Sequence, residues 1–126
     1  MAAKYKVLVT DYVWPSLAPE RGVLEPIGAE LVAAPTADAE TLAGLAGDAD
    51  AILTCFAKVP RGVIEAATKC RIIARYGIGV DNIDLAAATE RGIVVTNVPA
   101  YCTDEVSDHA LALILALGRK LMSYDR

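Results

Sequence analysis

The chain has 126 residues, of which 55% are hydrophobic, so it is the length of one ordinary domain with enough apolar side chains for a core. Its net charge of −4 and the lack of a basic stripe argue against nucleic acid as a partner, and no apolar run approaches the about 18 residues of a membrane span. Three scattered cysteines (Cys55, Cys70, Cys102) fit the reducing cytoplasm and argue against a disulfide framework or a cysteine-based zinc site, and the start of the chain does not resemble a signal peptide.

Strand-like and helix-like segments alternate along residues 1–98. Apolar runs predict strands at residues 5–10, 29–34, 49–54, 71–75 and 93–96. Helices are expected at residues 18–27, 38–45, 61–68 and 85–90. Gly28 ends the first helix, Thr36 or Asp38 caps the second, and Pro60 precedes the third. This alternation predicts a parallel sheet with helices on both faces.

Five strands with short helical crossovers are typical of a flavodoxin-like α/β domain of three layers, with strand order 2-1-3-4-5. We assign this order by analogy, because hydrophobic periodicity cannot supply it. FMN is not an expected ligand, since residues 11–16 after the first strand lack the Ser-, Thr- and Gly-rich loop that would hold its phosphate.

A glycine-containing loop follows the fourth predicted strand, where Gly77 and Gly79 stand two residues apart. Ligands of open α/β sheets bind at the carboxyl ends of the strands. Two close glycines let backbone N–H groups approach a small anion such as a carboxylate. The alternative is a tight strand-to-helix turn whose glycines need positive φ. Cys55 follows the third strand at the same edge, and we expect it to line a pocket rather than to react.

Three polar residues beyond this loop, Asp81, Asn82 and Asp84, invite a metal-site interpretation. Their spacing lacks the glycine and the closing glutamate of a calcium loop. Turn formation and capping of the helix at Leu85 is therefore the preferred account.

A long apolar helix is expected from Val106 to Met122, with Thr103 as its N-cap. Asp104 and Glu105 lie in the first turn, where carboxylates suit the helix dipole. Apolar side chains surround almost the whole helix, so it needs cover on more than one side.

Three sequence segments resemble the D-isomer-specific 2-hydroxyacid dehydrogenases, the family of D-phosphoglycerate dehydrogenase, D-lactate dehydrogenase and the C-terminal-binding proteins. They are RYGIGVDNID at 75–84, AATERGIVVTNVP at 87–99 and EVSDHALALILAL at 105–117, while the first 70 residues match more loosely. The resemblance implies that residues 1–98 form the substrate domain and that residues 99–126 are the hinge and the first helix of an NAD-binding domain. It also implies that the chain is an amino-terminal piece of the enzyme.

The resemblance implies NAD- or NADP-dependent oxidation of a small D-2-hydroxy acid, or reduction of the 2-oxo acid, by the whole enzyme. Thr103 and Val106 would face the nicotinamide. The implied substrate-binding residues are Tyr76, Gly77, Ile78, Gly79, Tyr101 and Cys55.

No catalytic residue is expected in this chain, because the family's Gly-x-Gly-x-x-Gly motif and its catalytic arginine, glutamate and histidine have no match here. We expect the chain alone to be inactive and not to bind NAD(P) tightly. His109, the only histidine, is expected to pack or to bond Glu105 rather than act as a base. Arg75 is expected to make an ordinary ion pair or helix-end contact, and contact with a substrate anion is the alternative.

Two further expectations concern the last helix and the class of protein. The helix should either fold back into the slot that the family's carboxyl-terminal helix fills, or pair two chains through residues 103–122. The alternative to an enzyme fragment is a stand-alone flavodoxin-like or protein-interaction module without catalysis.

Overall fold

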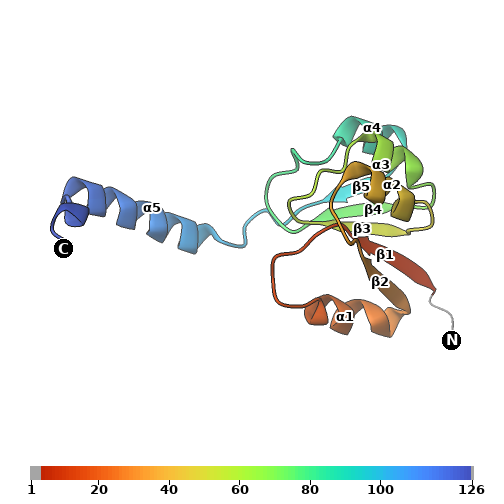
Figure 1. The fold of residues 1–126 in the computed structure, drawn as a ribbon, viewed down its shortest axis with the longest axis horizontal. Coiled ribbons are helices and arrows are strands. Elements are labelled where there is room, and N and C mark those ends of the chain that lie inside the picture. The colour runs from red at the N-terminus through yellow and green to blue at the C-terminus, as the bar shows by residue number, and fades with distance from the viewer. Residues whose placement is uncertain (1–3, 126) are drawn as a thin grey trace.

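The computed structural model describes residues 4–125, which form one parallel sheet flanked by helices (Figure 1). The strands are β1 (Tyr5–Val9), β2 (Ala29–Ala33), β3 (Ala51–Thr54), β4 (Ile72–Arg75) and β5 (Val94–Thr96). The helices are α1 (Ala18–Leu24), α2 (Ala39–Ala46), α3 (Arg61–Ala66), α4 (Leu85–Glu90) and α5 (Thr103–Gly118). The strand order is β2-β1-β3-β4-β5, so the predicted α/β fold and strand order are confirmed.

Local sequence determines where several helices begin and end. The side chain of Asp38 accepts the Thr41 N–H at 2.9 Å, so Asp38 rather than Thr36 is the N-cap of α2. Asp84 caps α4 in the same way, accepting the Ala87 N–H at 2.8 Å. The first predicted helix changes to a 3-10 turn at Glu25–Ile27 because Pro26 has no N–H to continue the α-helical bonding. Gly28, at φ 85°, then ends it as predicted.

The core lies mainly on the face of the sheet that α2, α3 and α4 cover (Figure 1). There Leu8, Ile52 and Ile73 of the strands meet Leu42 and Ile64 of the helices, and all five side chains are fully buried. Burial of this apolar area is the main stabilising contribution to the fold.

The opposite face of the sheet is covered by α1 over β1 and β2, where Val7, Val9 and Leu31 pack with Leu17. Helices on both faces are therefore confirmed. Beyond α1 the cover ends, and Ile72 and Val94, which are paired in register on this face, are exposed.

Helix α5 projects away from the domain at the edge where the strands end (Figure 1). None of its residues is buried, and Leu113, Ile114 and Leu117 are exposed. The predicted fold-back of this helix into the slot of the family's carboxyl-terminal helix is therefore wrong for the described residues. Pairing of two chains through this helix stays a prediction.

Two details of α5 also differ from expectation. Cys102, not Thr103, occupies the N-cap position, and its side chain makes no capping hydrogen bond. The helix ends at Gly118, followed by Lys120 at φ 52° and a 3-10 turn at Leu121–Ser123. Among residues 4–125, no helix is both long enough and apolar enough to cross a membrane.

Candidate functional site

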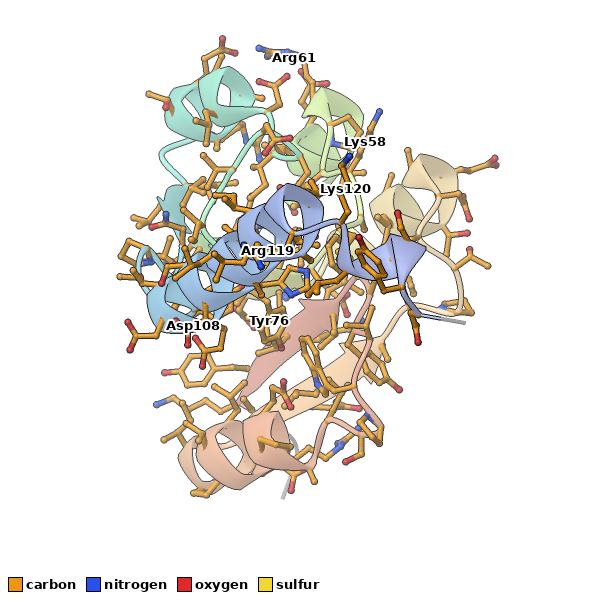
Figure 2. The ribbon with its side chains drawn as sticks, turned by 90° about the vertical axis from the view of Figure 1, so that its left-hand side faces the viewer. Lys58, Arg61, Tyr76, Asp108, Arg119 and Lys120 are labelled. Carbon is orange, nitrogen blue, oxygen red and sulfur yellow. The ribbon has the colours of Figure 1, made fainter. Side chains whose placement is uncertain are left out.

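A pocket of about 390 Å³ opens at the carboxyl ends of β1, β3 and β4. Each of its walls comes from the loop that follows one of these strands or from the segment before α5. We call it the carboxyl-edge pocket and define it by its lining residues: Val13, Trp14, Cys55, Phe56, Tyr76, Val98 and Tyr101. Figure 2 views the molecule from the α5 end, with Tyr76 on the domain behind that helix.

The wall formed by Cys55 and Phe56 is fixed by Asp11, from the loop after β1. One carboxylate oxygen accepts the Cys55 N–H at 2.9 Å and the Thr10 hydroxyl at 2.8 Å. The other accepts the Phe56 N–H at 2.8 Å. Burial opposes ionisation of Asp11, but these hydrogen bonds outweigh it and lower its pKa below the ordinary 3.8. The sequence analysis missed Asp11, although an acidic residue directly after a buried strand is a usable signal.

A second wall is aromatic, and of its two rings the sequence predicted Tyr76 but not Trp14. The Trp14 ring stands edge-on to Tyr76, with centroids 4.6 Å apart and an interplanar angle of 72°. Such edge-to-face pairs hold both rings in defined positions. Burial, and then the nearby Glu20 carboxylate, raise the pKa of the Tyr76 hydroxyl above its ordinary value, so this group stays neutral at pH 7.

The glycine loop lies directly beyond Tyr76 in the chain, and its carbonyl groups and N–H groups differ in their hydrogen bonding. The Gly77 carbonyl accepts the Val98 N–H at 3.0 Å, and the Ile78 carbonyl accepts the Asn97 side-chain amide at 2.7 Å. The N–H groups of residues 77–79 bond no backbone carbonyl within the described part of the chain. Asn97 and Val98 therefore hold the carbonyl side of the loop and leave its three N–H donors for another acceptor.

Neighbouring side chains lie close to the two glycines, neither of which has a positive φ. Within residues 4–125 the glycines at positive φ are Gly28 and Gly92, so the predicted alternative of a positive-φ turn at 77 and 79 is wrong. A Cβ at Gly77 would lie 2.5 Å from Nη1 of Arg75, and one at Gly79 would lie 2.9 Å from Oδ1 of Asp81. Both distances are too short for a carbon atom, so a side chain at either position would displace the Arg75 guanidinium or the Asp81 carboxylate, each the end of a flexible side chain.

Arg75 brings a positive charge to this loop. Its Nε donates to the Cys55 carbonyl at 3.2 Å, which holds the side chain beside Gly77. The ion pair expected for Arg75 does not form among the described residues. Free N–H donors next to a guanidinium make the loop a suitable receptor for a small anion.

The structure brings together only part of the predicted site. Cys55, Tyr76 and Tyr101 line the carboxyl-edge pocket, and the glycine loop adjoins it in the chain. Thr103 and Val106 are exposed on α5 and line no described pocket. His109 is also exposed and, within residues 4–125, makes no hydrogen bond to Glu105.

The remaining candidates have structural roles. Asn82 donates its side-chain amide to the Ala57 carbonyl at 2.8 Å, and Asp84 caps α4. Among the described residues, no group of three His, Cys, Asp or Glu side chains is arranged to hold a metal. Burial and the Asp11 charge raise the pKa of the Cys55 thiol, against the opposite effect of Arg75, so this thiol stays protonated at pH 7.

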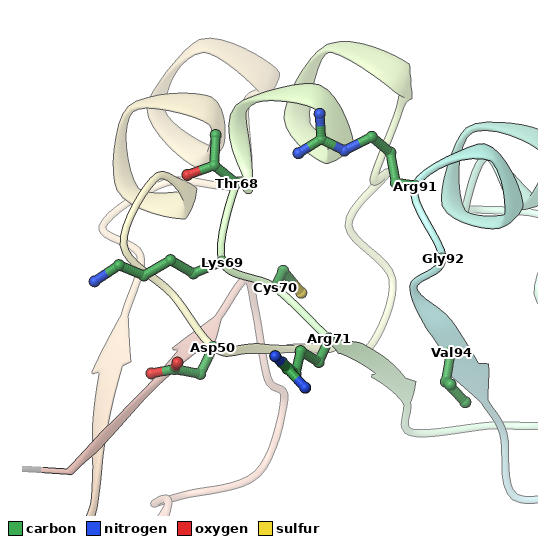
Figure 3. A pocket seen from close by; sticks show the side chains of 8 residues that line it. All are labelled: Asp50, Thr68, Lys69, Cys70, Arg71, Arg91, Gly92 and Val94. Atoms are coloured by element: carbon green, nitrogen blue, oxygen red, sulfur yellow. The ribbon is translucent and has the colours of Figure 1, made fainter.

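A larger pocket, of about 610 Å³, lies at the opposite edge of the sheet (Figure 3). It is lined by Asp50, Thr68, Lys69, Cys70, Arg71, Arg91, Gly92 and Val94. Figure 3 shows Lys69 and Arg91 separated, with the Lys69 amine pointing away from Arg91. Because its cations do not converge, this pocket is the weaker candidate despite its size.

Comparison with known proteins identifies the family of the chain. The family described as D-isomer specific 2-hydroxyacid dehydrogenase, catalytic domain, matches residues 7–121. D-3-phosphoglycerate dehydrogenase of Archaeoglobus fulgidus is 54% identical over 69 residues, which are 55% of this chain and 13% of that protein. Glyoxylate reductase of Thermococcus litoralis is 46% identical over 79 residues, which are 62% of this chain and 24% of that protein.

Solved structures resemble the chain as well. The NADPH-dependent glyoxylate/hydroxypyruvate reductase of Sinorhizobium meliloti, in complex with NADP and malonate, is 32% identical. It superposes with a TM-score of 0.72 over 90% of this chain and 34% of that chain. The chain thus spans 13% to 24% of the length of the two curated relatives. Because the family match covers nearly every described residue, the chain belongs to the D-isomer-specific 2-hydroxyacid dehydrogenase family.

Proposed function

We propose that this chain supplies the carboxylate-binding half of an NAD(P)-dependent dehydrogenase site that interconverts a D-2-hydroxy acid and its 2-oxo acid. Residues 1–98 would form the substrate domain, and residues 99–126 the hinge and first helix of the cofactor domain. The observation that carries the proposal is the row of free N–H groups at residues 77–79, beside the Arg75 guanidinium and at the carboxyl edge of the sheet.

In this proposal the substrate carboxylate accepts hydrogen bonds from the loop N–H groups. Charge-assisted hydrogen bonds of this kind are roughly twice as strong as neutral ones. Arg75 strengthens them further through its nearby charge, while its bond to the Cys55 carbonyl keeps the guanidinium in place. The hydrogen bonds that Val98 and Asn97 donate to the Gly77 and Ile78 carbonyls would orient the loop before the substrate arrives.

The described residues do not fit a nicotinamide nucleotide. Thr103 and Val106 lie exposed on a projecting helix, and Gly77-Ile78-Gly79 carries Asn82 where the nucleotide motif needs its third glycine. We therefore place NAD or NADP, which similar structures hold, in another part of the whole enzyme. The 126-residue chain alone would bind a 2-hydroxy acid without turning it over.

Titration with D-lactate and with its neutral analogue lactamide tests the proposal. Amide resonances of Gly77, Ile78 and Gly79 should shift with D-lactate in a 15N NMR spectrum and respond much less to lactamide, because the loop binds the charged group. Equal responses to both compounds, or none at these three residues, would contradict the proposal. Turnover of NADH with glyoxylate, hydroxypyruvate or pyruvate by the chain alone would contradict the expected inactivity.

A further inference from the structure

The walls of the carboxyl-edge pocket carry information about the substrate beyond its carboxylate. None of the seven lining residues is an Asp, Glu, Lys or Arg. The thiol of Cys55 and the hydroxyl of Tyr76 are both held neutral at pH 7. The pocket therefore offers an incoming ligand an uncharged surface made mostly of aromatic and aliphatic carbon.

Much of this surface is open to solvent. Val13 is 72% exposed, Phe56 is 66% exposed and Tyr101 is 60% exposed. A cluster of large apolar side chains in contact with water is typical of a ligand-binding surface. Covering it with an apolar group would release its ordered water and stabilise the complex.

Neither Arg75 nor Lys58 lines this pocket. Arg75 is held beside Gly77 by its bond to the Cys55 carbonyl, at the carboxylate end of the proposed site. Lys58, three residues after Cys55, lines a different pocket together with Asp81 and Asp84. A phosphate or second carboxylate in the carboxyl-edge pocket would find no cation among the lining residues.

Two carboxylates that do not line the pocket, those of Asp11 and Glu20, lie next to residues that do. The Asp11 carboxylate is within hydrogen-bond distance of the backbone of Cys55 and Phe56, and Glu20 lies near the Tyr76 hydroxyl. Negative charges at these positions repel a second anionic group and leave an uncharged one unaffected.

We infer that the preferred acid carries an uncharged apolar side chain at C2, which occupies the carboxyl-edge pocket while its carboxylate binds the glycine loop; a branched aliphatic acid is the test case. This inference rests on the proposed function and names its substrate class. Phe56 and Trp14 are its specificity-determining residues, because one forms the exposed wall and the other packs against Tyr76.

Fluorescence titration of the whole 126-residue chain tests the inference. Trp14 is the only tryptophan and lines the pocket, so its emission reports occupancy directly. The probes are (R)-2-hydroxy-4-methylpentanoate, D-lactate and D-3-phosphoglycerate. The branched acid should bind roughly ten-fold or more tightly than D-lactate, since it buries three further carbon atoms, and the phosphorylated acid should bind no more tightly than D-lactate.

Two matched variants separate side-chain recognition from folding. Phe56→Arg should weaken binding of the branched acid and strengthen binding of D-3-phosphoglycerate. Phe56→Leu should keep the original order of the three affinities. Circular dichroism confirms that both variants fold. Two outcomes would overturn the inference and leave the proposed function standing: equal affinity for D-lactate and the branched acid, or tightest binding of the phosphorylated acid. No binding of any of the three acids would overturn both.

Discussion

The Asp11 carboxylate accepts the backbone N–H of Phe56 at 2.8 Å, although the two residues are 45 positions apart in sequence. A second bond, at 2.9 Å, joins the same carboxylate to Cys55. Asp11 therefore sets the shape of the carboxyl-edge pocket without lining it. The shape of this pocket therefore depends on one ionised side chain, which accepts hydrogen bonds from two backbone N–H groups of a neighbouring loop.

Replacement of this carboxylate should loosen the pocket wall. Asp11→Ala leaves the Cys55 and Phe56 N–H groups without an acceptor, so we expect a loss of about 2 kcal/mol in the free energy of unfolding. Urea denaturation measures this loss. Asp108→Ala, which removes a carboxylate from the exposed helix α5, is the control and should change stability by much less. Equal stability of the two variants would show that the Asp11 bonds contribute nothing.

A methyl group at Gly77 should disturb the loop through Arg75. Because the added carbon would lie 2.5 Å from Nη1, the guanidinium must move away from the loop. We expect Gly77→Ala to weaken D-lactate binding about ten-fold, which corresponds to about 1.4 kcal/mol. Gly44→Ala is the matched control, since a Cβ there meets nothing within 4 Å. Unchanged affinity in Gly77→Ala would show that the position of Arg75 is irrelevant to binding.

The cap of α2 should make part of the stability depend on acid pH. The Thr36 hydroxyl, and then the Thr41 N–H, lower the pKa of Asp38 from 3.8 to about 2. A lowered carboxyl pKa adds stability that is complete above about pH 4 and is lost as the pH falls towards 2. The asparagine introduced by Asp38→Asn also caps a helix but does not titrate. The variant should therefore lose less stability than the original chain between pH 4 and pH 2, as measured by urea denaturation. Identical losses would assign the acid sensitivity to other carboxylates.

The exposed apolar face of α5 predicts self-association. Leu113 is 52% and Leu117 is 76% exposed, and such a face in water favours pairing with a second copy. Sedimentation should show a concentration-dependent dimer, which the double substitution Leu113→Lys and Leu117→Lys abolishes. A monomer at all concentrations would exclude pairing through this helix.

Most of the fold could be predicted because its strands and helix ends depend on short stretches of local sequence. Strands of a parallel sheet are mostly apolar on both faces and therefore appear in the sequence as short apolar runs, as at β3 and β4, although Ile72 of β4 is exposed. Gly28 and Asp84 mark helix ends through their own chemistry, which needs no distant partner.

The site could be predicted only in part, because its shape depends on contacts between distant loops. Gly77 and Gly79 were singled out as an anion loop, but sequence cannot tell whether a glycine is needed for positive φ or for close approach. The structure shows that neither glycine has a positive φ and that the Arg75 side chain lies against Gly77. Asp11 and Trp14 were missed because their partners lie in the loops after β3 and β4, which the sheet brings beside them.

The most direct test of the carboxylate-binding account is a crystal structure of the chain with (R)-2-hydroxy-4-methylpentanoate. The account predicts carboxylate oxygens within hydrogen-bond distance of the N–H groups of Gly77, Ile78 and Gly79, with the branched side chain against Phe56 and Trp14. A carboxylate bound elsewhere, with the loop donors left to solvent, would contradict it.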